Sequence, residues 1–379
     1  MYIWEDKAWP RFTFDTNEIK PRLDNVLVLQ EQLIGKAKDL PKGLDKQAEM
    51  DALIQDAVKT SQIEGEPLNV GSVRSSVAKH LGLDQAGLTP GNHQTENLVA
   101  MLCAATDNLD QPISQQILCE WQAALFPEPS ILKNLAIGEL RGDTPMQVVS
   151  QKGSREIIHF EAPPKNRLQQ ELVEFIDWFN LEQPLEMHGI VRAAVIHLWL
   201  ITIHPFEDGN GRVTRAITDR ALAQDEKTSI RFYSLSAAIE SNRAAYYEIL
   251  ENTQSCKTET QQQDGNTTNI TEWINWFLDV LAQAMQQGQH RIERVIDKTR
   301  FWHTHSQTAL SEQQIKVLNR LLDGAGDEFK EGINANKYQG IAKVSKATAT
   351  RHLTELLGKG CLIQIGGGRS TRYVINTGK

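Results

Sequence analysis

The chain has 379 residues, of which 40% are hydrophobic, and a formal net charge of −8 at pH 7. This length allows two or three domains with cores of their own, and the acidic balance argues against a surface that binds nucleic acid throughout. The four cysteines follow neither a metal-site spacing nor a disulfide framework, and no apolar run is long and uncharged enough to span a membrane, so we expect a cytoplasmic protein.

Residues 1–90 are predicted to form an N-terminal extension of a helical body. An aromatic cluster before Asp15 is expected to pack as an irregular cap. A helix is predicted over residues 49–64, because apolar side chains recur there at helical spacing and Gly65 is a natural C-cap. Glu64 closes this helix, where its charge opposes the helix dipole at a cost on the order of 0.3–1 kcal/mol. A basic partner would offset that cost.

A β-hairpin is predicted next in the chain. Two short β-branched runs, one ending at Ser150 and one beginning at Glu156, flank residues 151–154. These central residues include a glycine and a serine, which are common in turns. The residues alone leave open whether the hairpin binds anything.

The segment from about Met187 to Ile203 is apolar and compatible with a helix almost throughout, which predicts a buried helix. Pro205 disfavours helical geometry in the residue before it, so the helix should end there and leave His204 at the mouth of a loop. An imidazole in that position can act as a general base near neutral pH. Phe206 is expected to be a core anchor.

A glycine-bounded turn and two arginines follow. Gly209, Asn210 and Gly211 can all adopt positive φ, which would let backbone N–H groups converge just before a helix that begins at Arg212. Such a nest at a helix N-terminus binds phosphate. Arg212 and Arg215 are three residues apart and share a helix face, where two guanidinium groups can clamp separate phosphates. The alternative is a helix–loop–helix with a solvated charge cluster.

Asp208 is the one carboxylate beside this turn that looks out of place. A carboxylate next to a polyphosphate repels it unless a cation bridges the two. The loop therefore implies a Mg²⁺ ion held by Asp208 and by oxygens of the substrate.

The segment from residue 301 to 379 differs from the rest in charge, with eleven Lys or Arg and six Asp or Glu, a net charge of +5. Helices are predicted over residues 311–322, 341–344 and 345–357, with a hairpin over 361–375. This order is typical of a winged helix-turn-helix, which can read DNA or serve as a docking or dimerisation module. In the DNA-binding form, the contacting residues would be Lys346, Thr348, Thr350, Arg351, Arg369 and Arg372.

The stretch from His204 to Arg215 resembles the signature of the Fic family, His-x-Phe-x-(Asp/Glu)-Gly-Asn-Gly-Arg-x-x-Arg, and matches it at every fixed position. The resemblance implies a mainly α-helical fold, with a Fic core and β-hairpin flap at residues 91–300 and the winged helix-turn-helix at 301–379. It implies a protein adenylyltransferase that moves AMP from ATP to a Ser, Thr or Tyr hydroxyl of a target protein or of itself, releasing pyrophosphate. The implied substrate is ATP and the implied metal is Mg²⁺, while a homodimer is compatible with this architecture.

The resemblance also assigns roles to individual residues. His204 would take the proton from the target hydroxyl, and Asp208 would hold Mg²⁺. Residues 209–211 would form the anion hole, and Arg212 and Arg215 would hold the departing phosphates.

Residues 60–65 are similar to the inhibitory motif of that family, (Ser/Thr)-x-x-x-Glu-(Gly/Asn), in the class that carries it N-terminal to the core. By this resemblance, Glu64 pairs with Arg215 and pushes the ATP γ-phosphate out of its productive pose. The flap would align a target segment by main-chain pairing. The residues bordering the nucleotide would be Gln147, Val148, Val149 and Ser150 from the flap, with Tyr246 and Gln254 from a helix that carries a tyrosine pair.

Three alternatives stay open from the sequence. The donor could be another nucleotide such as UTP, or the enzyme could remove AMP from a target, with Glu64 orienting the water. The third is a transcription regulator whose core only senses nucleotide. The intact His204 argues against this last reading, because a sensor does not need a base.

Overall fold

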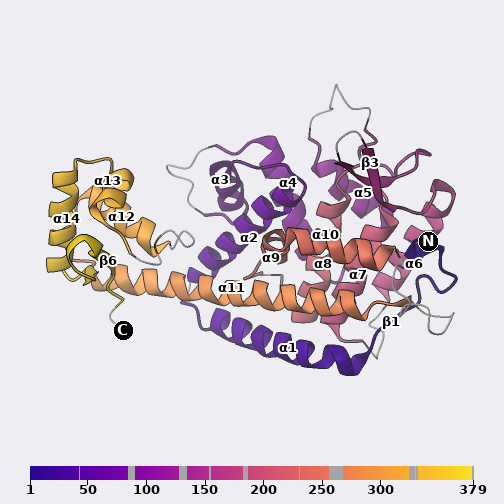
Figure 1. Ribbon diagram of the computed structural model, residues 1–379, viewed down its shortest axis with the longest axis horizontal. Helices are drawn as coiled ribbons and strands as arrows, with labels where there is room; N and C mark the ends of the chain where they lie inside the picture. The colour runs from indigo at the N-terminus through magenta and orange to yellow at the C-terminus, as the bar shows by residue number, and fades with distance from the viewer. Residues whose placement is uncertain are drawn as a thin grey trace. The chain divides into compact units, whose positions relative to one another are not determined.

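The computed structural model describes residues 1–41, 43–83, 90–127, 135–152, 155–181, 187–229, 231–255, 268–323, 329 and 332–377. The fold is mainly α-helical (Figure 1). The helices are α1 (Thr16–Lys38), α2 (Leu44–Ile63), α3 (Val70–His80), α4 (His93–Thr106), α5 (Gln115–Ala124), α6 (Lys165–Asn180), α7 (Gly189–Ile203), α8 (Asn210–Glu226), α9 (Leu235–Ser241), α10 (Arg243–Gln254), α11 (Thr271–Thr304), α12 (Glu312–Leu322), α13 (Ala335–Ala342) and α14 (Lys346–Gly358), with short 3₁₀ turns η1 (Ile3–Glu5) and η4 (Gly368–Ser370). The strands are β1 (Phe12–Thr13), β2 (Gln147–Lys152), β3 (Arg155–Glu161), β4 (Thr268–Asn269), β5 (Leu362–Ile365) and β6 (Arg372–Ile375).

The chain divides into two compact units. The first comprises residues 1–35 and 49–288, and the second comprises residues 36–48 and 289–379. The boundaries between the units fall within the residue ranges of α1, α2 and α11. The division into residues 1–90, 91–300 and 301–379 stays a prediction. None of the described helices combines the length and apolarity needed to cross a membrane.

Helix α7 lies at the centre of the first unit. Each of its residues, from Gly189 to Ile203, is buried, as its apolar sequence predicts. It packs against α6 and α8, and rings from the N-terminal segment and from α6 surround Trp199 near its C-terminal end. The ring centroids of Trp9, Phe12 and Phe175 lie 5.6–6.3 Å from that of Trp199, at steep interplanar angles. Edge-to-face packing of this kind fixes the end of α7, where the site begins.

The N-terminal aromatic segment packs on this core. The sequence predicted an irregular cap, but part of the segment forms a strand. Strand β1 pairs in parallel with β4, far along the chain. Each strand has only two residues, too few to produce a recognisable alternating pattern. The polar composition of residues 254–269 predicts a loop between helices, and residues 256–267 of this stretch lie outside the described residues.

Helix α2 ends as the sequence predicts. Gly65 adopts a positive φ of 81°, and the Gly65 and Glu66 N–H groups donate to the carbonyls of Gln62 and Ser61 at 3.0 and 2.9 Å. A left-handed glycine followed by such bonds closes the helix and turns the chain sharply. Glu64, immediately after the last helical residue, is therefore held at a fixed point.

Strands β2 and β3 form the predicted antiparallel hairpin, with a register shift between Val148 and Val149. Several apolar side chains of the hairpin are exposed, namely Val148, Val149, Ile157 and Ile158. Residues 153 and 154 of the expected turn lie outside the described residues.

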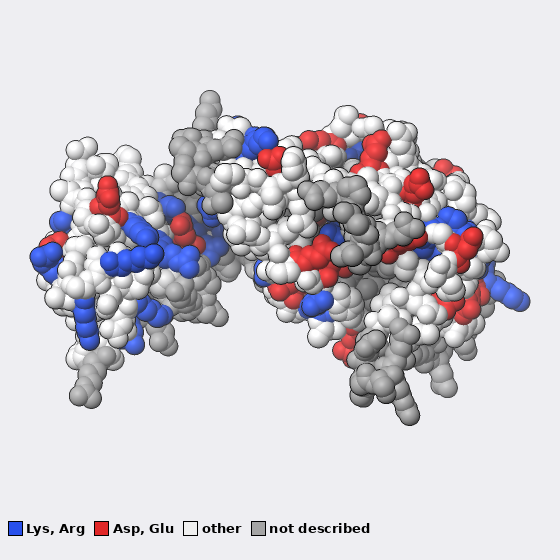
Figure 2. All heavy atoms as spheres, turned by 90° about the horizontal axis from the view of Figure 1, so that it is seen from above, with Lys and Arg blue, Asp and Glu red and all other residues white. Residues whose placement is uncertain are grey.

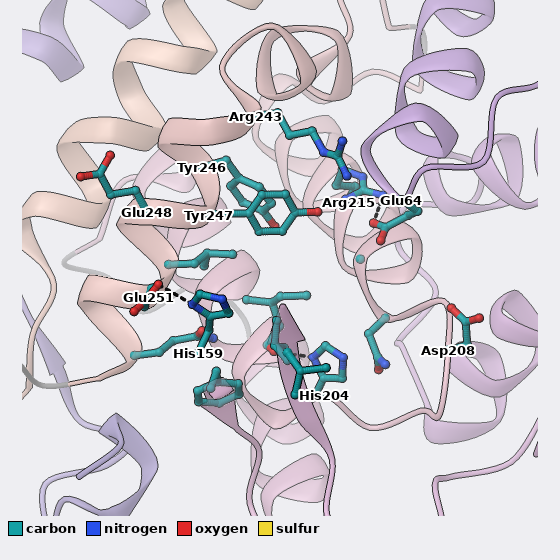
Figure 3. Close-up of a pocket in the computed structure, with 18 of the residues that line it drawn as sticks. Glu64, His159, His204, Asp208, Arg215, Arg243, Tyr246, Tyr247, Glu248 and Glu251 are labelled. Carbon is teal, nitrogen blue, oxygen red and sulfur yellow. Dashed lines mark hydrogen bonds and ion pairs between the residues drawn. The ribbon is translucent and has the colours of Figure 1, made fainter. Parts of the chain in front are cut away.

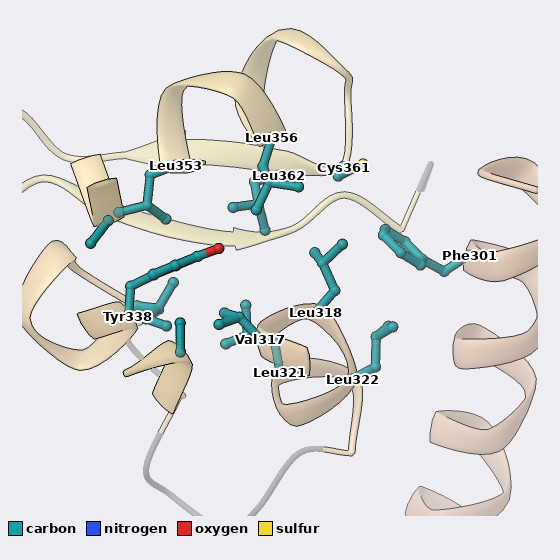
Figure 4. Close-up of a cluster of buried hydrophobic side chains, with 13 residues drawn as sticks. Phe301, Val317, Leu318, Leu321, Leu322, Tyr338, Leu353, Leu356, Cys361 and Leu362 are labelled. Carbon is teal, nitrogen blue, oxygen red and sulfur yellow. The ribbon is translucent and has the colours of Figure 1, made fainter. Parts of the chain in front are cut away.

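The second unit has its own apolar core, built from α11, α12, α13, α14 and the β5–β6 hairpin (Figure 4). Tyr338, Leu353 and Leu356 point into this core. Helices α12 and α14 begin directly after Ser311 and Ser345, whose side chains cap them. The three helices and the hairpin occur in the predicted order, while the assignment to the winged-helix class stays a prediction.

The predicted second helix of this unit, residues 341–344, is wrong in its bounds. Helix α13 begins at Ala335, because the Asn334 side chain accepts from the Lys337 N–H and caps it. It ends at Ala342, and Tyr338 supplies its main core contact. Figure 2 shows Lys and Arg side chains spread over the surface of this unit, in keeping with its positive charge.

Candidate active site

A cavity of about 800 Å³ opens in the first unit, between the β2–β3 hairpin, the α7–α8 loop, α10 and the end of α2 (Figure 3). Its volume is within the range of small-molecule sites. Most of the residues predicted for the site line it together: Glu64, Val148, Val149, His204, Asp208, Gly209, Asn210, Gly211, Arg215, Tyr246 and Gln254. Arg212 and Gln147 are not among the lining residues, and the Ser150 side chain lies outside the described set.

His204 stands at the end of α7, as Pro205 predicts. It adopts a left-handed backbone conformation with φ 51° and ψ 61°, an uncommon geometry for a side chain other than glycine. Its Nδ1 lies 3.1 Å from the Ile201 carbonyl oxygen. Because a carbonyl can only accept, Nδ1 carries the proton in the neutral ring, and Nε2 keeps the lone pair that a base needs.

The pKa of His204 lies below its usual value. Burial is the main cause and Arg141 adds to it, while the hydrogen bond to Ile201 and the charges of Glu64 and Asp208 act in the opposite direction. The neutral imidazole is therefore the form present at neutral pH, which suits a general base.

Arg141 fixes the backbone around His204 and was not predicted from the sequence. Its side chain is 1% exposed, and its Nε donates to the His204 carbonyl at 2.7 Å. Its backbone N–H donates to the Pro205 carbonyl at 3.0 Å. A buried guanidinium has several donors in a rigid fork, so it holds the left-handed residue and the start of the loop together.

The loop then turns through Gly209, whose φ is 88°, into α8. The expectation that the helix begins at Arg212 is wrong, since it begins at Asn210. Only Gly209 of the three predicted residues has a positive φ. The Asn210 side chain exchanges two hydrogen bonds of 2.8 Å with the backbone of Phe206, which is fully buried as expected. These bonds shape the loop, so the helix begins two residues earlier in the chain than predicted.

The predicted anion site therefore corresponds to a helix N-terminus and not to a chain of left-handed residues. The first intrahelical bond of α8 runs from the Val213 N–H to the Gly209 carbonyl. The N–H groups of residues 210–212 precede it and have no intrahelical acceptor. Such groups, with the positive end of the helix dipole, bind anions.

Arg215 projects into the same place from the first turns of α8. Its side chain is 1% exposed. Thr60 of α2 holds it twice, through Nε to the hydroxyl at 2.7 Å and through Nη2 to the carbonyl at 2.9 Å. Its Nη2 also donates to Glu64 Oε1 at 2.7 Å, while Nη1 is buried without a hydrogen-bond partner.

Glu64 thus meets Arg215 across the cavity wall (Figure 3). Burial by itself would raise the pKa of Glu64, but the charge of Arg215, with smaller contributions from Arg212 and His204, outweighs burial and lowers it. A methyl group in place of a Gly211 hydrogen would collide with the Glu64 carboxylate. The carboxylate therefore rests against the first turn of α8, where an anion would bind.

Arg212 makes a second ion pair with the segment after α2. Its Nη1 lies 2.6 Å from Glu66 Oε2, and its side chain is 3% exposed. Its Nε and Nη2 lack hydrogen-bond partners. Glu66 was not predicted from the sequence. It lies two residues after Glu64, so a separate carboxylate partner for each of the two arginines could have been expected.

Asp208 is 38% exposed, and its Oδ1 accepts from the Gly209 N–H at 2.7 Å. Within the described residues, no three His, Cys, Asp or Glu side chains form a group suited to a metal ion. Mg²⁺ commonly binds through one or two carboxylates together with substrate phosphates. The chemistry of this donor fits such an ion only when a polyphosphate supplies the remaining oxygens.

The two tyrosines of the pair on α10 differ in exposure. Tyr246 is 2% exposed, and its hydroxyl lies 3.0 Å from Nε2 of the buried His197. Tyr247 is 41% exposed, with its hydroxyl donating to the Ile63 carbonyl at 3.3 Å. The second tyrosine is thus the one that presents more surface. Gln254 is 4% exposed and donates to the Thr202 hydroxyl at 2.9 Å.

The hairpin contributes both apolar and polar groups to the cavity. Val148 and Val149 line it from β2, while the Gln147 side chain turns to Glu161 at 2.7 Å. From β3, His159 Nδ1 lies 2.8 Å from Glu251 Oε2 of α10. This pair was also missed, because one residue comes from a strand and the other from a helix more than ninety positions away.

Two family models match the chain. Residues 2–83 match a domain of unknown function, DUF4172, and residues 112–222 match the Fic/DOC family. Residues 112–222 therefore form a domain of the Fic/DOC family.

Similar proteins agree with this assignment. Over 180 residues the chain is 26% identical to Protein adenylyltransferase Fic of Culex quinquefasciatus, which covers 47% of this chain and 33% of that protein. Over 48 residues it is 44% identical to Protein adenylyltransferase fic-1 of Caenorhabditis briggsae, covering 13% of this chain and 10% of that protein. The chain thus spans a third or less of the length of these relatives.

Solved structures share the fold. A Fic family protein from Desulfovibrio desulfuricans G20 superposes with a TM-score of 0.51 at 17% identity, covering 97% of this chain and 98% of the other. A Fic domain containing signaling protein from Bacteroides thetaiotaomicron VPI-5482 gives a TM-score of 0.52 at 19% identity, covering 70% and 97%. At these identities, the likeness concerns the fold alone.

Proposed function

We propose that the protein is an adenylyltransferase that moves AMP from ATP to a hydroxyl side chain of a target protein, or of itself, and that Glu64 holds this activity back. One observation carries the proposal. A base, His204, and an anion-binding helix N-terminus with Arg215 face one cavity, and Glu64 occupies the anion position.

The transfer balances with the residues in place. The oxygen of a Ser, Thr or Tyr hydroxyl attacks the α-phosphorus, and His204 Nε2 takes the hydroxyl proton. A bond from that oxygen to the α-phosphorus forms, while the bond from the α-phosphorus to the oxygen that bridges the α- and β-phosphates breaks. Pyrophosphate leaves with the bonding electron pair. The N–H groups of residues 210–212 stabilise charge on the phosphoryl oxygens.

The departing phosphates need positive charge beyond the helix N-terminus. Arg215 supplies it once Glu64 moves away, and Arg212 supplies it when it leaves Glu66. A Mg²⁺ ion held by Asp208 would neutralise charge between the phosphates. Asp208 is the residue that we expect to contact that ion.

Glu64 acts on this arrangement by occupying space and charge. Its carboxylate uses the Arg215 donor that a γ-phosphate would use, and it lies against Gly211. A nucleotide bound beside Glu64 would hold its α-phosphorus out of line with the target hydroxyl and His204. Removal of the carboxylate therefore restores the productive pose.

The direct test uses separate incubations of the purified protein with ATP, GTP, UTP and CTP, each labelled in the α-phosphate. The proposal expects covalent label from ATP, and more of it from Glu64→Gly than from the unmodified chain. Label from UTP alone would make the enzyme a transferase for a different nucleotide. No covalent label from any nucleotide in Glu64→Gly would overturn the proposal.

The second unit supports a second proposal, binding of duplex DNA. Ala349, Leu353 and Leu356 of α14 face the core, which turns Lys346, Thr350 and Arg351 to solvent. A helix with one exposed polar and basic face has the form of a recognition helix. The other residues proposed to contact DNA are Thr348, Arg372 and Arg369, of which the Arg369 side chain lies outside the described residues.

Titration of the whole chain with duplex DNA at low salt tests this second proposal. Binding that weakens steeply with salt, and that is lost when residues from Ser306 onward are deleted, supports it. If the whole chain shows no duplex binding at low salt, the unit is a protein docking or dimerisation module. Sedimentation of the whole chain then distinguishes a homodimer from a monomer.

A further inference from the structure

One side of the cavity holds a hydrogen-bonded histidine–glutamate pair that the proposed reaction leaves unused. His159 of β3 and Glu251 of α10 meet at 2.8 Å through Nδ1 and Oε2, and both line the cavity. Their side chains are 31% and 32% exposed. The pair joins the hairpin to α10, so each partner restricts the rotamers of the other.

This pair lies away from the phosphate side of the cavity. In Figure 3, Glu64 and Arg215 lie at one side, and His159 and Glu251 lie at the other. A nucleotide whose phosphates sit at the start of α8 must direct its base away from that point. The base end of the ligand therefore falls on the side of the cavity that holds His159 and Glu251.

The wall leading to the pair suits a flat ring. Tyr247 is 41% exposed and lies four residues before Glu251, so the two side chains share one face of α10. Leu250 and Phe160 add apolar surface. A base that stacks on an aromatic ring exposes its polar edge beyond that ring, and one helical turn further on this edge would meet Glu251.

Gln254, the residue expected from the resemblance to contact adenine, is already bonded. Its amide donates to Thr202 in the interior, and it is 4% exposed. Glu251 is one turn nearer to Tyr247 and more accessible. A carboxylate has about four acceptor sites, so it can accept from His159 and from a ligand at the same time.

Building on the proposed adenylyl transfer, we propose that Glu251, oriented by His159, selects a nucleotide whose base carries an exocyclic amino group over one with a carbonyl oxygen at that position. An ionised carboxylate accepts hydrogen bonds and donates none. It can therefore bind the 6-amino group of adenine, whereas it repels the 6-oxo oxygen of hypoxanthine. His159 acts as a positioning residue, because it fixes the carboxylate without touching the base.

The matched probes are ATP and ITP, whose purine rings differ at position 6. The assay measures kcat/KM for covalent transfer from each, using the Glu64→Gly chain, with binding of the same nucleotides measured by calorimetry. We expect a preference for ATP of about ten- to a hundredfold, the size of one half-exposed hydrogen bond to a charged group. Glu251→Gln should bring the preference to within about threefold, because an amide can donate to the 6-oxo oxygen.

Two further variants sharpen the test. His159→Ala should lower the preference only in part, because the Glu251 carboxylate keeps its charge but loses its fixed orientation. Glu248→Gln is the matched control on the same helix, because Figure 3 shows its carboxylate turned away from Glu251 and His159. It should keep the full preference for ATP.

The outcomes separate this proposal from the proposed function. If the ratio of kcat/KM for ATP to that for ITP is unchanged in Glu251→Gln, the assignment is overturned. It is also overturned if Glu251→Gln instead loses discrimination between ATP and 2′-deoxy-ATP, because Glu251 would then contact the ribose. If no transfer occurs but calorimetry shows a preference that Glu251→Gln abolishes, adenylyl transfer is wrong and the base assignment stands. Equal binding of ATP and ITP by the chain with His159 and Glu251 intact would contradict the base assignment.

Discussion

Glu64 offers the sharpest test of how the site is controlled. In Glu64→Gly, the contact of 2.7 Å to Arg215 Nη2 is lost, and so is the carboxylate that rests on Gly211. Arg215 should keep its place, because Thr60 still holds it through two hydrogen bonds of 2.7 and 2.9 Å. The freed guanidinium then points two nitrogens at the position of the departing phosphates.

The size of the effect follows from the contact that is removed. A hydrogen bond between charged groups contributes about 1.5–3 kcal/mol, and about 1.4 kcal/mol changes a rate tenfold. Glu64 is 29% exposed, so solvent weakens its part of the pair. We expect AMP transfer to rise by about ten- to a hundredfold, seen chiefly as self-modification by intact-mass spectrometry.

Two matched variants show whether the rise has the proposed cause. Glu64→Gln keeps the shape and an acceptor but loses the charge, so it should be activated less than Glu64→Gly. Adding Arg215→Ala to Glu64→Gly should return transfer to background, because the freed arginine is what holds the phosphates. Unchanged or lower transfer in Glu64→Gly would refute the reasoning and leave Glu64 as a bystander or as a residue of the reverse reaction.

Three other predictions concern neighbouring groups. Glu66→Gln removes the charge beside Arg212 and should raise transfer by about two- to fivefold, as expected for a partly exposed pair; a fall in rate would contradict it. Asp208→Ala should lower Mg²⁺-dependent turnover by at least about a hundredfold, while calorimetry without metal shows unchanged ATP binding; an unaltered Mg²⁺ dependence would remove Asp208 as the metal residue. Burial, aided by the charge of Arg215, lowers the pKa of His197 to about 3, so the neutral ring stabilises the fold fully above pH 6.5 and that stability is lost as pH falls toward 3. Urea unfolding should therefore show a slope of up to about 1.4 kcal/mol per pH unit in that window, reduced in His197→Asn; equal slopes in both chains would contradict it.

Local sequence signals were enough to predict the elements that carry the site. The apolar run of α7, Pro205 after it and Gly65 after α2 each act within a few residues of where they stand, so the ends of both helices could be placed. The meeting of Glu64 with Arg215 was predicted from a resemblance, since no local rule brings positions 151 residues apart into contact. Once the chain is folded, Thr60 shows why the arginine stays there.

What could not be predicted depends on contacts across the fold. The start of α8 moved to Asn210 because its side chain bonds to Phe206 in the preceding loop. Arg141 could not be connected to His204, because its partners are backbone carbonyls, which have no sequence signature. The His159–Glu251 pair is likewise a product of how β3 lies against α10.

The central claim is that the cavity transfers an adenylyl group with His204 as the base. The most direct measurement incubates Glu64→Gly with ATP labelled in the α-phosphate and, separately, in the γ-phosphate, and follows the label that stays covalently attached. The account predicts covalent label from the α-phosphate only, and none when His204→Ala is added while ATP binding persists. Covalent label from the γ-phosphate, or transfer near the Glu64→Gly rate in the His204→Ala chain, would contradict it.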